Sequence, residues 1–164
     1  MRRLMTMLAA GALAAGVIVT PAAATTTRIP IHCDETRITD WTGGREWLDE
    51  EFVYHVRGQS ADYLDVGSPY CAGINHATVT VVNLDLLTGE GVVVVTGHRE
   101  LTAFDGGWDA TLVAHMTPGG EFIWVGQVVG NGFGELAGYQ YRSTVYETTH
   151  EATVEDGFVF LPGE

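Results

Sequence analysis

Residues 108–116 read WDATLVAHM, and apolar side chains occupy every second position. The intervening positions include Asp109, Thr111 and His115. A period of two residues is typical of a β-strand with one face buried. Turn-forming residues flank it, with DGG at 105–107 and TPGG at 117–120. The alternating apolar residues are Trp108, Ala110, Leu112, Ala114 and Met116.

The same combination of short strand and tight turn extends through most of the chain. No stretch of 12 or more residues has the spacing of an amphipathic helix. Eight strands joined mostly by short turns predict an all-β fold, an antiparallel meander closed into a barrel, with a β-sandwich as the alternative. An eight-stranded barrel is filled by side chains or holds one small ligand. The predicted strands cover residues 29–38, 47–57, 78–86, 92–104, 108–116, 122–129, 136–148 and 153–161.

One predicted strand is apolar on both faces. Val92, Val93, Val94 and Val95 follow one another without a polar residue between them. Such a run needs cover on each side of the sheet. We expect its outer face to be covered by the N-terminal segment or by a second subunit, so an oligomer is one expectation.

The N-terminal residues have the pattern of a targeting segment. A basic start at residues 1–3 precedes an apolar run over 4–20 and the small residues Ala22–Ala24. This order predicts a secretory signal peptide over residues 1–24 and a single secreted domain over 25–164. The alternative is an uncleaved membrane anchor, but the apolar run is near the lower limit for spanning a bilayer.

Two cysteines are present, Cys33 and Cys71. In an exported chain an even number of cysteines predicts a disulfide. Closing this loop is expected to stabilise the fold by about 4 kcal/mol. The alternative is a reactive thiol beside His32, but Asp34 and Glu35 follow directly, and a reactive thiolate needs positive surroundings.

The charge balance excludes several classes of partner. The chain has 21 acidic and 8 basic residues, all of the latter arginine, for a formal charge of −13. Loss of Arg2 and Arg3 with the signal peptide would make it −15, since that segment has no acidic residue. Binding to nucleic acid or to an anionic membrane needs a basic face. Neither partner is expected.

Three stretches resemble a known group of proteins. They are YHVRG at 54–58, GGWDA at 106–110 and VGNGFGELAG at 129–138, within a region of resemblance that covers about 53–146. Their order is similar to that of small exported bacterial proteins of unknown function, whose barrel resembles the allene oxide cyclase-like group. The resemblance implies a barrel around an apolar, fatty-acid-derived substrate, with a buried carboxylate assisting cyclisation. No position here matches that carboxylate by motif.

Catalytic and metal-binding motifs are scarce. Residues 98–100 place His98 and Glu100 on one face of a strand, where we expect both to meet water. No cupin-like His pattern occurs, and no metal or cofactor is expected. No serine lies in Gly-x-Ser-x-Gly. The acidic run 49–51 is expected to be solvated, with Ca²⁺ binding as the alternative. Glu100 and Arg142 are the weak catalytic candidates.

Aromatic residues are the remaining candidates for a binding site. They fall on strand faces that also carry apolar residues, so they either line a pocket or fill a solid core. We therefore expect a secreted barrel that binds a small apolar or aromatic ligand without chemistry of its own. The alternatives are a cyclase or isomerase acting in the barrel and an extracellular structural or interaction protein. The candidate ligand-binding residues are Tyr54, Trp108, Trp124, Tyr139 and Tyr141.

Overall fold

The computed structural model describes residues 27–116, 124–149 and 151–162. The predicted signal peptide and the predicted turn at 117–120 lie outside these residues. Within them no helix has the length and apolarity needed to cross a membrane. The described elements are ten strands: β1 (Arg28–Arg37), β2 (Arg45–Leu48), β3 (Val53–Arg57), β4 (Ser60–Gly67), β5 (Gly73–Asp85), β6 (Gly91–Leu101), β7 (Gly106–Met116), β8 (Trp124–Gly134), β9 (Gln140–Thr149) and β10 (Ala152–Phe160).

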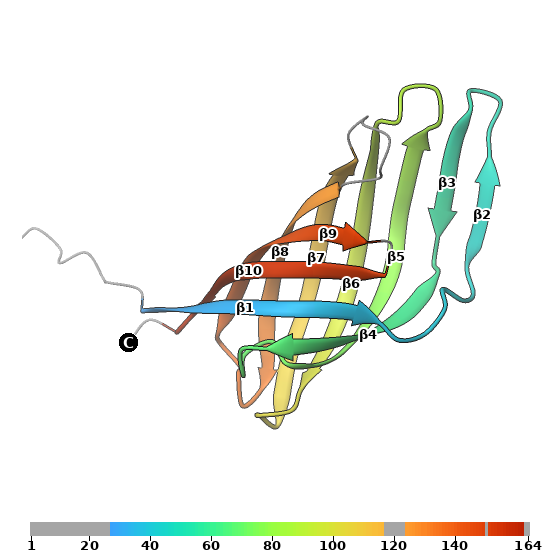
Figure 1. The fold of residues 1–164 in the computed structure, drawn as a ribbon. Helices are drawn as coiled ribbons and strands as arrows, with labels where there is room; N and C mark the ends of the chain where they lie inside the picture. The colour runs from blue at the N-terminus through green and yellow to red at the C-terminus, as the bar shows by residue number, and fades with distance from the viewer. Residues whose placement is uncertain (1–26, 117–123, 150, 163–164) are drawn as a thin grey trace, which may run out of the picture.

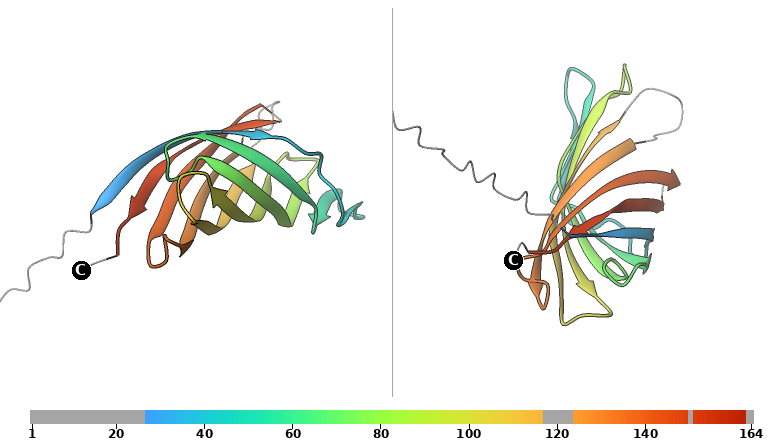
Figure 2. Two further views of the ribbon diagram at one scale, coloured as in Figure 1. Left: turned by 90° about the horizontal axis from the view of Figure 1, so that it is seen from below. Right: turned by 90° about the vertical axis from the view of Figure 1, so that its left-hand side faces the viewer.

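Eight of the strands close into an antiparallel barrel (Figure 1). From β5 to β10 each strand pairs with the next, as in the predicted meander. The ring then closes through β1, which pairs with β10 on one edge and with β4 on the other, and β4 pairs with β5. The closed barrel confirms the predicted fold. In Figure 2, seen from below, the blue β1 and the red β10 arch over the other strands.

Strands β2 and β3 form a hairpin that extends one rim of the barrel. β3 pairs with the C-terminal half of β5, while β4 pairs with its N-terminal half. Gly58 lies between β3 and β4 with a φ of 73°, a left-handed conformation that favours glycine. Its N–H donates to the carbonyl of Val79, close to a register shift in β5. Because the chain bends at Gly58, β4 in the barrel and β3 in the hairpin can both pair with the same edge of β5.

Several predicted bounds were wrong, since β5 begins at Gly73, β8 continues to Gly134 and β9 begins only at Gln140. Two further differences change the number of strands. The segment 47–57 is two strands with a turn between them, where Asp49 accepts hydrogen bonds from the N–H groups of Glu51 and Val53. β4 was not predicted. Its apolar Leu64 and Val66 are exposed while Asp65 is buried, so its side chains reverse the usual pattern.

The barrel is sealed at the end where the disulfide lies. Cys33 on β1 and Cys71 between β4 and β5 form the predicted disulfide, and both side chains are fully buried. Trp108 packs beside them, and its indole N–H donates to the carbonyl of Tyr70 at 2.7 Å. Leu136, from the loop before β9, is also buried in this cluster. The seal forms a solid floor for the space above it.

The valine run divides between the two faces of β6. Val93 and Val95 point into the barrel and line its cavity. Val92 and Val94 face outward and are half-buried, and Val94 is paired across the strands with the exposed Val113. Cover of this outer face by a second subunit stays a prediction.

Candidate ligand-binding site in the barrel

The barrel contains a cavity of about 330 Å³ that is partly open to solvent. It extends from Trp108 and Arg99, near the sealed end of the barrel, to Met116 and Trp124, which lie at the strand ends opposite the disulfide. Its walls are mostly aliphatic and aromatic, with a few charged groups at the floor and rim. The apolar walls are formed by Val56, Ala77, Val79, Val82, Leu84, Val93, Val95, Ala110, Leu112, Val128 and Val145.

A row of small residues crosses four neighbouring strands of the barrel. Ala77, Gly97, Ala110 and Gly130 are successive cross-strand partners on β5, β6, β7 and β8. A side chain added at Gly130 would meet the ring of Tyr141, its partner on β9. A side chain added at Gly97 would meet that of Asn75, so the two glycines make room for the side chains of Tyr141 and Asn75 beside the cavity.

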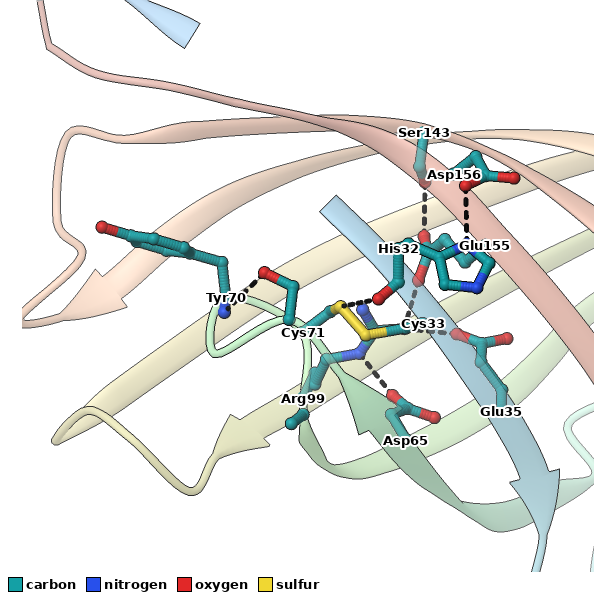
Figure 3. The surroundings of a disulfide bond; sticks show 12 residues. His32, Cys33, Glu35, Asp65, Tyr70, Cys71, Arg99, Ser143, Glu155 and Asp156 are labelled. Carbon is teal, nitrogen blue, oxygen red and sulfur yellow. Dashed lines mark hydrogen bonds and ion pairs between the residues drawn. A yellow bond between two sulfur atoms is a disulfide. The ribbon is translucent and has the colours of Figure 1, made fainter. Parts of the chain in front are cut away.

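The floor of the cavity carries a buried ionic group, which we name the Arg99 cluster: Arg99, Glu35, Asp65 and Glu155 (Figure 3). Arg99 Nη2 lies 2.5 Å from Glu35 Oε1 and 2.9 Å from Glu155 Oε2, and Nε lies 2.6 Å from Asp65 Oδ2. Nη1 donates to the Tyr141 hydroxyl at 3.0 Å. Four strands, β1, β4, β6 and β10, therefore meet at one guanidinium.

Two hydroxyl groups complete the surroundings of the cluster. Thr153 donates to Glu35 Oε2 at 2.5 Å, and Ser143 donates to Glu155. The side chains of Asp65 and Glu155 are completely inaccessible to solvent. Glu35 and Glu155 are therefore both paired and hydrogen-bonded, whereas Asp65 is held by its ion pair with Arg99, since neither of its carboxyl oxygens has a hydrogen-bond partner among the described residues.

One guanidinium cannot neutralise three carboxylates, and the pKa values reflect this. Burial raises the pKa of Asp65 to about 8, against the attraction of Arg99 and with the repulsion of Glu35. Burial likewise raises the pKa of Glu155 well above its ordinary value. Burial lowers the pKa of Arg99, but its three carboxylates outweigh this and hold it above its usual range. At neutral pH the cluster therefore combines a guanidinium cation with protonated carboxyl groups.

Four of the five aromatic candidates line the cavity. Trp108 and Tyr141 form its floor, with ring centroids 5.3 Å apart and exposures of 0% and 1%. Trp124 and Tyr54 lie nearer the rim, where the Tyr54 hydroxyl donates to Glu46 at 2.5 Å. Tyr139 lies outside the cavity, half-buried against the sealed end.

The two weak catalytic candidates lie on the outer face. Because side chains alternate along a strand, Arg99 and Tyr141 point inward, and their neighbours Glu100 and Arg142 point into solvent. The Arg142 guanidinium lies 5.7 Å from the ring of Phe160. Neither residue borders the cavity, so they play no part in the function proposed below.

The Arg99 cluster was not among the sequence-based candidates, although one signal for it exists. His98 and Glu100 were expected to face water, and in a strand this requires Arg99 to face the interior. An arginine in a barrel needs buried carboxylates as partners. No comparable local signal marks Asp65, since β4 itself was not predicted.

Four histidines pair with aspartates outside the cavity, and three of these histidines are exposed. His32, His76 and His98 each have Nδ1 2.7 Å from an aspartate oxygen, and His55 Nε2 lies 2.8 Å from Asp49. Among residues 27–116, 124–149 and 151–162, no three or more His, Cys, Asp or Glu side chains are grouped so as to hold a metal ion.

The raised pKa of Asp65 predicts that stability falls as pH rises. The folded protein keeps this proton up to about pH 8, whereas the unfolded chain loses it near 3.8. Between these values the folded state binds more protons, so the free energy of unfolding decreases from about pH 4 to about pH 8. Urea unfolding across this range should show the slope, and Asp65→Asn should reduce it. Asp34→Asn, on the exposed face of β1, is the matched control; equal slopes in all three proteins would contradict the prediction.

Comparisons with known proteins identify no relative: no family model, curated protein or solved structure matches the chain. The eight-stranded barrel agrees with the fold implied by the allene oxide cyclase-like resemblance. That the chain belongs to this group stays a prediction.

Proposed function

We propose that this protein binds a small, mostly apolar molecule inside the barrel, with the polar group of the ligand directed to the Arg99 cluster. The observation that carries the proposal is the cavity of about 330 Å³. Ligand pockets begin at about 300 Å³ and combine apolar walls with a few polar groups. This cavity has both, because Glu35, Arg99 and Glu155 border an otherwise largely aliphatic and aromatic space.

The closed end supports binding within the barrel. Trp108 and Tyr141 are held in place by packing, by the bond from Trp108 to the Tyr70 carbonyl and by the bond from Arg99 to Tyr141. Rigid aromatic surfaces lose little entropy when a ligand binds. The floor is therefore organised before the ligand arrives.

We propose further that the protein works after export. The Cys33–Cys71 disulfide is compatible with an oxidising, extracellular location. The basic start, apolar run and small-residue site of residues 1–24 support the same location.

A second candidate is a cyclase or isomerase acting in the cavity. The observation in its favour is Glu155, a buried carboxyl group that borders the cavity and whose pKa is raised well above the ordinary value. A carboxyl group that keeps its proton at neutral pH can donate it to a reacting oxygen. Chemical change of a bound ligand, lost in Glu155→Gln while binding persists, would distinguish this enzyme from a binding protein.

The binding proposal is tested by placing a larger side chain inside the cavity. Ala110 points into the cavity, whereas the adjacent Thr111 is exposed on the outer face of β7. With 3-phenylpropan-1-ol as the probe, calorimetry should detect saturable binding to the natural protein. Ala110→Leu should weaken it by about tenfold or more, since the added atoms occupy the ligand's space. Thr111→Leu should bind as the natural protein does.

Circular dichroism and thermal melting establish that both variants are folded. Equal binding by both variants would place the probe outside the barrel and contradict the proposal. Absence of binding to the natural protein would contradict it for ligands of this size.

A further inference from the structure

We infer that the barrel cavity selects a positively charged ligand, an amine on an apolar or aromatic skeleton, over the corresponding carboxylate. This inference rests on the proposed function and names the charge of its ligand. It follows from the way the Arg99 cluster and the cavity walls are built.

The only arginine bordering the cavity within the described residues has its nitrogens engaged. Its Nη2 contacts Glu35 and Glu155, its Nε contacts Asp65, and its Nη1 donates to Tyr141. A ligand carboxylate would have to displace one of these buried carboxyl groups to reach the guanidinium. Arg99 is thus a structural counter-ion and not a free anion-binding group.

The other charged groups of the cavity are acidic. Glu35 and Glu155 lie at the floor, and Glu147 and Glu151 lie toward the rim. Arg37 lies 3.7 Å from Glu151 on the same face of β1 as Glu35, so it offsets part of the acidic charge at the rim. The whole chain has a formal charge of −13. Carboxylates around a low-dielectric cleft concentrate cations, and both the net charge of the chain and the glutamates of the cavity favour a cation over an anion at this site.

Aromatic rings supply a second attraction for a cation. Trp41, Tyr54, Trp108 and Trp124 border the cavity together with Tyr141. The Arg99 guanidinium already lies 5.6 Å from the ring of Tyr141. Ammonium groups bind favourably over such rings, most strongly where water is excluded.

Protons held by the cluster couple amine binding to pH. The titratable groups that face Glu155 and Asp65 are Glu35 and Arg99, and Tyr63 from β4 stays neutral because burial raises its pKa to about 12. An ammonium group near the cluster replaces a proton in balancing the carboxylates, and that proton is released. Amine binding is therefore expected to tighten between pH 6 and pH 8. Alkylamines stay protonated throughout this range.

Three probes with one skeleton test the inference: 3-phenylpropylamine, 3-phenylpropan-1-ol and 3-phenylpropionate. Calorimetry at pH 7.5 should give an amine affinity about tenfold or more above that of the alcohol, with the carboxylate weakest. Titrations in buffers of different ionisation enthalpy should reveal proton release on amine binding alone.

Two matched variants test whether the preference for the amine over the alcohol arises at the Arg99 cluster. Glu155→Gln removes a buried carboxyl group of nearly the same shape and should reduce the amine's advantage over the alcohol about fivefold or more. Glu100→Gln removes an exposed carboxylate from the outer face and should leave that advantage unchanged. Thermal melting confirms that both variants fold.

The outcomes separate this inference from the function on which it rests. If the carboxylate binds as tightly as the amine or more tightly, and Ala110→Leu weakens both, the barrel binds ligands but the inferred selectivity is wrong. If the amine has no advantage over the alcohol, the inference is also wrong. If none of the three probes binds, the proposed function fails for ligands of this size, and the inference fails with it.

Discussion

Replacing Arg99 with methionine is expected to lower the free energy of unfolding by about 3–5 kcal/mol at pH 7. Methionine has a similar length but leaves Glu35, Asp65 and Glu155 buried without their shared cation. The Tyr141 hydroxyl also loses its donor. Breaking a buried network of ion pairs and hydrogen bonds is among the few causes of such large losses.

The matched control for this variant is Arg142→Met. Arg142 is exposed on the outer face of β9, so its replacement should change the free energy by less than about 0.5 kcal/mol. The deficit of Arg99→Met should also shrink as pH falls toward 4. Loss of the guanidinium raises the folded-state pKa values of the buried carboxyl groups further above their unfolded ones, so protonation relieves the destabilisation. A deficit below about 1 kcal/mol at pH 7, or one that grows at low pH, would mean that the cluster is not held together by charge.

The barrel was predictable because its pattern is local. In β7 every second residue from Trp108 to Met116 is apolar, and period-two alternation alone identifies both the strand and its inner face. β4 lacks this signal, since Asp62 and Asp65 put a carboxylate on each of its faces. Its conformation depends on pairing with β1 and β5, which are distant in the sequence. Such pairing is visible only once the fold is known.

The aromatic residues of the candidate site could be predicted from the sequence, whereas its buried charged residues could not. Aromatic residues such as Trp108 and Tyr141 were found because apolar strand faces point inward. Charged residues are expected at the surface, and an isolated glutamate or aspartate in a strand gives no reason to place it elsewhere. Glu35, Asp65 and Glu155 are stable inside because each contacts Arg99 and burial raises the pKa of Asp65 and Glu155. These contacts join residues of four strands, so the sequence of a single strand does not predict them.

Removing the disulfide with Cys33→Ala and Cys71→Ala together is expected to lower the free energy of unfolding by about 4 kcal/mol. The bond closes a sequence separation of 38 residues that includes β2, β3 and β4. Without it the unfolded chain gains conformational freedom, and the floor of the barrel loses a covalent link between β1 and the segment before β5. Urea unfolding of the double variant and of the natural protein measures the difference.

Reduction provides the control for this prediction, because it breaks the same bond without changing the sequence. The natural protein unfolded in reductant should show nearly the same loss, and its intact mass should rise by two hydrogens. An unchanged mass would show that the bond does not form, and a loss below about 1 kcal/mol in both experiments would contradict its stabilising role. The double variant should also weaken binding of 3-phenylpropan-1-ol, because Tyr70, whose carbonyl accepts the Trp108 indole N–H, is next to Cys71. Loosening that segment frees the ring that forms the cavity floor.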